Sequence, residues 1–312
     1  MKNDRPWATA GLGEQAFAAL AEGMPASEVW SLLLGVIERR AMQRAPAAVL
    51  QQWQADRFVL PAPMDQRTLL ELDSHLLAVA KDFEALELSP LAPLATCSSV
   101  ALTSQNRTIA TTRGTEVVSD PTNVLALESA RRLRQDSRQV VRLATCHRCV
   151  RAQVFPKLPG FAAHFRIFCM TTAGRESQDR AFVTAALVEH IQTHLAALDR
   201  LEQHGYRFGE RRVHILATPE NDTLASRIAS AIHNAPVATS PLTHGYYDGL
   251  RFRIDVGPGP AEAIPLIDGG AFNWLRKLTS NQKLSLVASG MGAQLAAHLF
   301  RTPITGTSPS AK

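Results

Sequence analysis

The chain has 312 residues, of which 46% are hydrophobic and 20% charged, and 33 Lys and Arg against 28 Asp and Glu give a formal net charge of +5. This is an ordinary globular composition, and so small an excess of positive charge does not by itself indicate nucleic-acid binding. No apolar run reaches the roughly 18 residues that a membrane span needs, and the N-terminus lacks the layout of a secretory signal. We therefore expect a cytoplasmic protein that is not membrane-bound.

The first sixty residues predict a small helical appendage. Helical apolar periodicity covers 14–24, 27–45 and 45–58, and Ser27 is a candidate N-cap. The following segment, 60–65, contains two prolines and is typical of a linker. We expect the main domain to span 61–301 and the remaining residues, 302–312, to form a disordered tail.

The main domain alternates helical and strand patterns. Helices are predicted at 66–86, 123–135, 181–206, 222–234 and 293–300. Strands are predicted at 140–153, 164–174, 210–218, 245–257, 262–275 and 283–292, the first two as a long hairpin and the fifth with a turn at its double glycine. Strand hairpins with helices between them favour an α+β fold, an antiparallel sheet backed by helices.

Cysteines and histidines give weak signals for a metal site. The pair Cys146 and Cys149 has metal-ligand spacing, but residues three apart on a strand point to opposite faces, so the two thiols cannot easily hold one ion. His190 and His194 are four apart on a predicted helix but lack the arrangement of a zinc-protease motif, so we expect a solvated helix face. We predict no metal site and reduced cysteines.

Nine arginines fall on predicted strands or loops. They could form a pocket for a phosphate or carboxylate, or they could form a basic stripe on the protein surface. Arg251 and Arg253 share one strand face, whereas Arg148 and Arg151 point oppositely. The nine are Arg107, Arg113, Arg142, Arg148, Arg151, Arg166, Arg175, Arg251 and Arg253.

Three segments carry a resemblance. Residues 141–174 form a strand that ends near Arg151, a loop, Gly160-x-x-x-x-Phe165 and a second strand. Residues 246–256 and 267–275 contain Tyr-Tyr-x-Gly and Gly-Gly, and residues 119–133 contain Asp-x-Thr at a helix start. Together they resemble the class II aminoacyl-tRNA synthetase core of the histidyl type, which is shared by the regulatory subunit of short-form ATP phosphoribosyltransferase.

The resemblance implies functional residues. Those implied for a nucleotide, ATP with Mg²⁺, are Arg151, Gln153, Phe165 and Arg166. Those implied for an amino-acid or similar ligand are Tyr246, Tyr247, Gly249, Arg251, Gly269 and Gly270, together with Asp120 and Thr122. Glu116 falls near the same predicted pocket, and the carboxylate of Glu116 or Asp120 could face an ammonium group of the ligand. Asp120 or Thr122 could instead serve as a helix N-cap. The resemblance also implies a homodimer through about 66–93.

Departures from the family pattern bear on activity. Leu242 and Ala297 stand where two functional arginines belong, although Arg301 lies one turn after Ala297. Losing one such donor to a transition state typically costs about 100- to 1000-fold in rate. The anticodon-binding domain that normally follows is also absent, so we do not expect ordinary tRNA charging.

Two hypotheses follow. In the first, the chain binds an amino acid or a nucleotide and regulates a partner enzyme. In the second, it is a free-standing ATP-dependent ligase that activates an amino acid for a non-tRNA acceptor.

Overall fold

The computed structural model describes residues 11, 13–153 and 161–302. The residues separate into two compact units, one of 1–60 with 110–115 and one of 61–109 with 116–312. The predicted tail lies almost wholly outside the described residues. No helix in the described ranges has the length and apolar character needed to cross a membrane.

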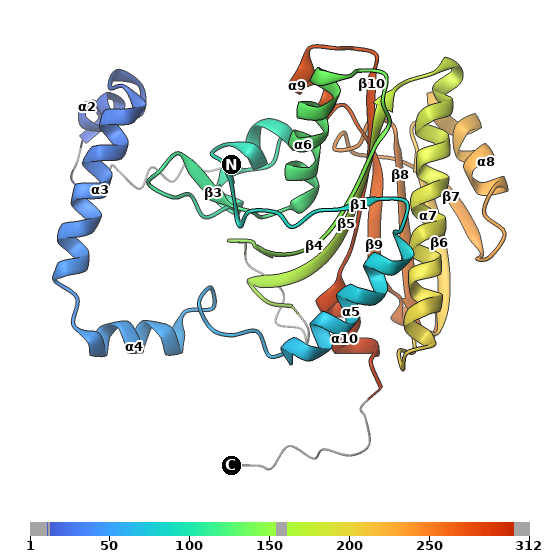
Figure 1. Cartoon of the computed structure of the whole chain (residues 1–312), viewed down its shortest axis with the longest axis horizontal. Helices are drawn as coiled ribbons and strands as arrows, with labels where there is room; N and C mark the ends of the chain where they lie inside the picture. Colours follow the sequence, from blue (N-terminus) through green and yellow to red (C-terminus); the bar gives the residue numbers. More distant parts are fainter. Residues whose placement is uncertain (1–10, 12, 154–160, 303–312) are drawn as a thin grey trace. The chain divides into compact units, whose positions relative to one another are not determined.

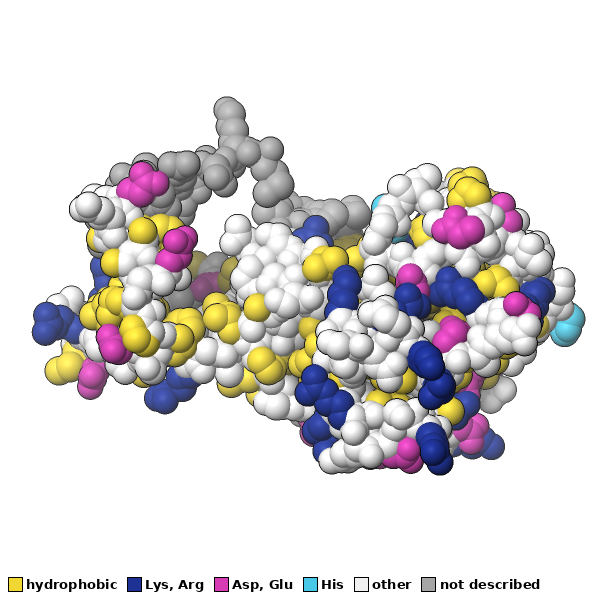
Figure 2. Space-filling model, turned by 90° about the horizontal axis from the view of Figure 1, so that it is seen from above, with side chains coloured by type: hydrophobic (Ala, Val, Ile, Leu, Met, Phe, Trp, Pro, Cys, Tyr) yellow, Lys and Arg dark blue, Asp and Glu magenta, His cyan; other side chains and the backbone are white. Residues whose placement is uncertain are grey.

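The first unit contains the helices that the sequence predicts: α2 (Gly13–Ala18) with η1 (Ala19–Gly23), α3 (Ala26–Met42) and α4 (Pro46–Ala55). None of them contains a buried residue. Large apolar side chains instead lie on their surface (Figure 2), among them Leu32, Ile37, Met42, Leu50 and Trp53. The helical periodicity is therefore real, but these helices bury no core of their own.

The second unit is built on one eight-stranded, mostly antiparallel sheet with the strand order β1-β4-β5-β10-β9-β8-β6-β7 (Figure 1). Its strands are β1 (Glu84–Ala85), β4 (Val141–Val150), β5 (His164–Arg175), β6 (Glu210–Ala217), β7 (Val237–Pro241), β8 (Leu250–Gly257), β9 (Ile264–Phe272) and β10 (Leu284–Met291). Only the β1–β4 and β6–β7 pairs are parallel. The predicted α+β class is confirmed.

Helices cover both faces of this sheet, and each face has its own hydrophobic core. One face packs against α5 (Gln66–Val79), α7 (Ala181–Glu202), α8 (Asp222–Ser230) and α10 (Ala293–Phe300). The other packs against η2 (Thr96–Val100), α6 (Pro121–Gln135) and α9 (Trp274–Thr279). Figure 1 shows α6 and α7 on opposite sides of β5 and β10. Alternation along each strand decides which core a side chain joins, as Phe168 and Cys169 of β5 illustrate.

The short elements before α6 form the polar part of the chain. They are β2 (Leu91–Pro93), paired with β3 (Thr115–Val117), and η3 (Gln105–Arg107). The remaining short turns are η4 (Gln178–Arg180), η5 (Pro219–Asn221) and η6 (Pro260–Glu262). Ala95 and Leu102 flank η2 with positive φ values of 72° and 52°. Two such residues so close together indicate a tightly constrained loop.

Two strand boundaries differ from the prediction. The predicted strand 245–257 begins only at Leu250, because Gly249 has φ of 78° and the preceding Tyr246 and Tyr247 lie in a turn. The double glycine is not a turn but lies inside β9, where Gly269 and Gly270 pair with Ser289 and Ala288 of β10. A Cβ on Gly269 would lie 2.5 Å from that of Ser289, so close strand packing explains the glycine better than chain reversal does.

Other predictions failed where tertiary contacts override local pattern. The segment after Asn273 forms α9 rather than continuing a strand, and β7 was not predicted at all. The predicted helix 66–86 ends at Val79. The expectation of a solvated face for His190 and His194 is wrong, because both rings are completely buried between α7 and the sheet.

Candidate functional site

A cavity of about 540 Å³ opens on the sheet face that carries α6 and α9. Its walls come from the segment around η2 and η3, the N-terminus of α6, the ends of β4 and β5, the turn before β8, and strands β8, β9 and β10. Nine of the residues implied by the resemblance line it: Asp120, Thr122, Arg151, Gln153, Phe165, Tyr246, Tyr247, Arg251 and Gly269. The fold therefore gathers most of the predicted ligand-binding residues from five separate segments.

Arg151 lies just beyond the end of β4, where the strand leads directly into the cavity. Its Nε donates to the carbonyl oxygen of Ser119 at 2.9 Å, and Nη2 lies 3.7 Å from Oδ2 of Asp120. The guanidinium also stands 5.1 Å from the centre of the Phe165 ring. These contacts fix a planar cation beside an aromatic ring, an arrangement suited to a phosphate or carboxylate next to a flat ligand group.

Asp120 has a structural role that accompanies any contact with a ligand. Its Oδ1 accepts hydrogen bonds from the backbone N–H and the hydroxyl of Thr122, at 3.0 and 2.7 Å, and so caps α6. Its other oxygen faces Arg151. The N-cap interpretation of Asp120 is thus confirmed, and the Thr122 hydroxyl donates to the capping carboxylate.

A second cation, Arg251, occupies the opposite wall. It makes a two-pronged contact with Asp268, with Nε to Oδ1 at 2.9 Å and Nη2 to Oδ2 at 2.7 Å. Tyr247 donates to the same carboxylate at 2.9 Å, and His244 lies 3.2 Å from Nη1 of Arg251. This bidentate geometry fixes the orientation of the guanidinium in the cavity wall.

The two tyrosines stay protonated at neutral pH. Burial, reinforced by the neighbouring Asp120, raises the pKa of Tyr246, and burial together with Asp268 raises the pKa of Tyr247. Both phenols can therefore donate hydrogen bonds. Tyr247 already donates to Asp268, whereas the Tyr246 hydroxyl has no hydrogen-bond partner among the described residues.

Arg107 of η3 is the cavity cation that is least engaged. Its side chain is exposed and makes no ion pair with the described residues, while its carbonyl oxygen accepts from Ala152 N–H at 2.9 Å. The sequence placed Arg107 among nine arginines and gave no reason to single it out. Of the others, Arg142 pairs with Glu189, Arg253 with Asp255, and Arg148 contacts His164.

Arg166, implied for the nucleotide, lies outside the cavity. It follows Phe165 on β5, so strand alternation sends it to the opposite face of the sheet, where it forms an ion pair with Asp73 of α5. Adjacent residues of one strand cannot both face the same ligand.

Glu116 is buried and does not line the cavity. Its carboxylate accepts from the N–H groups of Ala95 and Cys97, each at 2.9 Å, and from the Gln105 amide at 2.6 Å. These three bonds use its acceptor capacity to hold the loop around η2, so the ammonium-binding role is not available in this arrangement.

Gly249 and Gly270 act behind the cavity wall. A Cβ on Gly249 would collide with the Asn221 amide, and one on Gly270 would lie 2.5 Å from both the Leu250 carbonyl oxygen and the Tyr247 ring. Each glycine thus permits the close approach that seats the tyrosine turn, and neither is among the lining residues.

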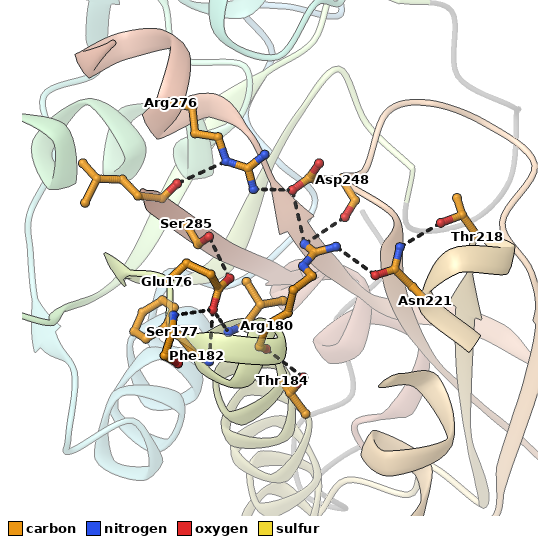
Figure 3. Close-up of polar contacts among 12 residues, drawn as sticks. Glu176, Ser177, Arg180, Phe182, Thr184, Thr218, Asn221, Asp248, Arg276 and Ser285 are labelled. Atoms are coloured by element: carbon orange, nitrogen blue, oxygen red, sulfur yellow. Dashed lines mark hydrogen bonds and ion pairs between the residues drawn. The ribbon is translucent and has the colours of Figure 1, made fainter. Parts of the chain in front are cut away.

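An ion-pair cluster anchors the turn that carries the tyrosines (Figure 3). Asp248 Oδ2 accepts from Nη2 of Arg276 at 2.8 Å and of Arg180 at 3.2 Å, and Arg180 continues to the Asn221 amide oxygen at 3.0 Å. Asp248 thereby ties the turn to α9 and to the start of α7. Tyr247, one residue earlier, is thereby fixed in the cavity wall.

The cysteines are structural. All four are free and buried, and burial raises the pKa of Cys149 to about 12 and also raises that of Cys146. Cys146 lies beside Asp73 on one face of the sheet, and Cys149 beside Arg151 on the other. Across the described ranges, no three His, Cys, Asp or Glu side chains are placed to hold a metal ion.

Several cavity residues were not predicted. They are contributed by backbone segments whose place in the wall only the fold reveals: Cys97, Ala101, Thr103, Ser119, Asn123, His244, Asp268, Ala288, Gly290 and Leu295. For Asp268 a signal existed, since it directly precedes the double glycine, but nothing in the sequence pairs it with Arg251.

The sequence matches no family model and no curated protein. Solved structures with a similar fold include an ATP phosphoribosyltransferase regulatory subunit/histidyl-tRNA synthetase from Bacillus halodurans, with 15% identity and a TM-score of 0.56 over 78% of this chain and 82% of that chain. A histidine–tRNA ligase subunit from Alicyclobacillus acidocaldarius has 12% identity and a TM-score of 0.55, over 76% and 94%.

A protein from Aeropyrum pernix described as a threonyl-tRNA synthetase is equally similar, with 11% identity and a TM-score of 0.57 over 75% of this chain and 59% of that one. Because proteins named for different amino acids score alike, fold similarity does not select a ligand. What these structures share with this chain is the class II aminoacyl-tRNA-synthetase-like fold, in a form also found in histidyl-type proteins.

Proposed function

We propose that the chain is a histidyl-tRNA-synthetase-like paralogue that binds an amino acid, a nucleotide or both in the main cavity and regulates a partner enzyme, without charging tRNA in the ordinary way. The observation that carries the proposal is that arginines line the cavity, whereas two arginines that the resemblance implies for adenylation are replaced by apolar residues. Arg107, Arg151 and Arg251 all line the cavity. Three guanidiniums in one concave site favour a ligand with a phosphate or carboxylate group.

The positions of the missing arginines support loss of the inherited reaction. Leu242 and Ala297 are 8% and 6% exposed and belong to the hydrophobic interior. Arg301, the possible substitute, donates instead to Thr68 and to Glu71 of α5, the latter at 2.7 Å. Neither lost cation is therefore replaced from these positions, and adenylation needs such cations to offset charge that develops on the phosphates.

Binding and exchange measurements test this proposal together. Calorimetric titration with ATP, AMP and a panel of amino acids should detect at least one ligand, while pyrophosphate exchange should stay at background for every amino acid. Absence of binding by every compound in the panel would contradict the proposal. Co-purification with a short-form phosphoribosyltransferase would support that enzyme as the partner.

A free-standing ATP-dependent ligase is the second candidate, and the retained Arg151 beside Phe165 is the observation that favours it. This ligase would activate an amino acid or another carboxylate for a non-tRNA acceptor. Pyrophosphate exchange above background with any substrate separates it from the purely regulatory function.

The chemistry of the cavity suits nucleotide phosphates better than it suits a metal ion on its own. Its two carboxylates, Asp120 and Asp268, are both engaged with arginines. Mg²⁺ in nucleotide sites is commonly held by one or two carboxylates together with the phosphates. In this proposal ATP brings Mg²⁺ with it, and the arginines of this chain bind the phosphate oxygens.

We also infer a homodimer formed through residues 66–93. Leu70 and Leu91 in this segment are exposed, at 60% and 42%, and apolar side chains on an oligomer surface are typically buried by the second copy. Light scattering coupled to size exclusion should give twice the chain mass of 34.0 kDa, and a monomer at micromolar concentration would contradict this inference.

A further inference from the structure

A second, smaller cavity of about 200 Å³ lies on the same sheet face as the main cavity, over strands β6 and β8. It is lined by Glu210, Arg212, His214, Arg253, Asp255, Gly257, Gly259, Pro260 and Ala263. Water occupies roughly 30 Å³ per molecule in the liquid, so this space fits a small group rather than a whole nucleotide. Neither the resemblance nor the proposed function uses it.

Strand pairing explains why charged residues meet in this cavity. Arg212 is the cross-strand partner of Asp255, and His214 is the partner of Arg253. Because residues two apart on a strand face the same side, all four side chains share one face. The next pairing places Arg253 opposite Asp268 of the main cavity, so the two cavities lie side by side along β8.

The only buried carboxylate of this cavity is already neutralised. Asp255 is 8% exposed, and its Oδ2 accepts a hydrogen bond from Nη2 of Arg253 at 2.7 Å. Its Oδ1 lies 2.7 Å from Nε of the same guanidinium, an ion-pair contact without hydrogen-bond geometry. His214 Nε2 lies 3.2 Å from the same carboxylate. Burial of the imidazole, and then the nearby guanidiniums of Arg253 and Arg212, lower the pKa of His214 against the pull of Asp255.

Arg212 does not take part in the ion pair between Arg253 and Asp255. It is half-buried and has neither an ion pair nor a side-chain hydrogen bond among the described residues. Glu210, the other carboxylate of the cavity, lies on the exposed rim. On this sheet face Arg212 and Arg253 lie diagonally, with His214 and Asp255 at the other two corners. Two guanidiniums around one buried carboxylate, with an imidazole beside them, are a favourable setting for an anion.

The glycine-rich turn after β8 closes one end of the cavity. A Cβ on Gly257 would lie 2.8 Å from the carbonyl oxygen of Glu262, so only glycine lets the chain fold back this tightly. The Gly-Pro-Gly-Pro sequence at 257–260 thus does more than reverse the chain: it brings Gly259 and Pro260 to the cavity wall.

We propose that this second cavity binds a small oxyanion, a phosphate or carboxylate group, through Arg212 and His214, separately from the ligand of the main cavity. Asp255 and Arg253 form the rigid base of the site, and Arg212 supplies the uncompensated charge.

The test is titration of the full chain with sodium phosphate, sodium sulfate and sodium acetate, each against sodium chloride at matched ionic strength. The readout is the imidazole signals of His214 in NMR spectra, assigned with the variant His214→Gln. Saturable movement of these signals is the expected result. Phosphate and sulfate acting without acetate assigns the site to phosphate groups, and the reverse assigns it to carboxylates. Movement that only follows ionic strength overturns the proposal.

Two variants separate this site from the main cavity. Arg212→Gln should weaken oxyanion binding at His214 by about tenfold or more, since a hydrogen bond to a charged group is lost. Arg212→Lys, which keeps the charge, should recover part of the affinity. Both should keep the parental melting temperature, because Arg212 has no ion pair or side-chain hydrogen bond to lose among the described residues.

Arg107→Gln is the matched control, since it removes a guanidinium from the main cavity. It should reduce nucleotide binding there and leave the response of His214 unchanged. If Arg107→Gln abolishes the response of His214 and Arg212→Gln does not, the anion sits in the main cavity and the proposal fails. Absence of binding by every nucleotide and amino acid of the panel, with an intact response at His214, would instead contradict the proposed function alone.

Discussion

The two faces of the large sheet carry polar clusters of opposite character. On the α7 face, the Ser289 hydroxyl lies 2.8 Å from His190 Nδ1 and 2.9 Å from His194 Nε2, and His190 also contacts Thr172 at 3.0 Å. These groups are uncharged and completely enclosed. On the cavity face, Arg151 and Arg251 are charged, partly exposed and only partly neutralised.

The difference shows that burial determines whether the polar side chains of one sheet are neutral or charged. Burial lowers the pKa of His190 far below its ordinary value and that of His194 to about 3, so both rings remain neutral acceptors or donors that hold α7 on the sheet. Arginine does not lose its charge under comparable conditions, so it is retained where solvent or a ligand can compensate it. The first cluster therefore stabilises the fold, and the second is the one for which we propose ligand binding.

Arg151→Ala should produce the largest effect on ligand binding, with a smaller loss of stability because its contacts with Ser119 and Asp120 are also removed. Loss of the fixed guanidinium beside Phe165 is expected to weaken nucleotide binding by about 100-fold or more, the range seen when a preorganised charged donor is removed. Calorimetric titration with ATP measures this change. Unchanged affinity would show that the cavity binds its ligand without the Arg151 guanidinium. Arg175→Ala, at an exposed position outside the cavity, is the control.

Acidification should destabilise the α7 face first. His194 has an ordinary pKa of 6.5 when unfolded and about 3 when folded, so between these values the unfolded chain binds more protons. The contribution of His194 to the free energy of unfolding is therefore fully present above about pH 6.5. It decreases as the pH falls and is smaller by about 2 kcal/mol at pH 5. Urea unfolding at pH 7.5, 6 and 5 measures it, and His194→Gln should flatten the slope. A pH-independent midpoint would contradict the buried neutral ring.

Gly270→Ala should damage the cavity face through packing. The added methyl group would press on Tyr247 and the Leu250 carbonyl oxygen, and overpacking of this kind costs about 1–3 kcal/mol. Thermal unfolding gives the stability loss, and ligand titration gives the displacement of Tyr247. Gly245→Ala is the matched control, because a Cβ there meets nothing within 4 Å. Equal effects of the two changes would refute the close approach.

Asp248→Asn should have the smallest effect. Asp248, Arg180 and Arg276 are each about a quarter exposed, so solvent screens their ion pairs, and the loss is expected to be about 0.5–1 kcal/mol. The change should shrink further at high salt, which thermal unfolding with and without 1 M NaCl can check. The control is Glu262→Gln, an exposed carboxylate without an ion pair among the described residues. A salt-independent loss would show that the cluster acts through shape rather than charge.

Much of the candidate site was predictable because the sequence keeps its strand periodicity. Alternating residues in β4 and β5 predicted the hairpin, and the hairpin places Arg151 and Phe165 at one end of the sheet. The same periodicity shows that Arg166 must leave the site, although the resemblance assigned it to the nucleotide. Glu116 could not be judged in advance, because its three donors come from Ala95, Cys97 and Gln105, in a loop without regular periodicity.

The sequence by itself determined the fold class and the β4–β5 hairpin, which are set by residue type and by repeats of two or 3.6. The significance of Leu242 and Ala297 came from the resemblance, which implies arginines at these positions. Only the tertiary structure decided that His190 and His194 are buried, that Asp268 pairs with Arg251, and that Arg212 has no counterion among the described residues beside a second cavity. These are pairings across strands far apart in the sequence, and no local pattern encodes the partner.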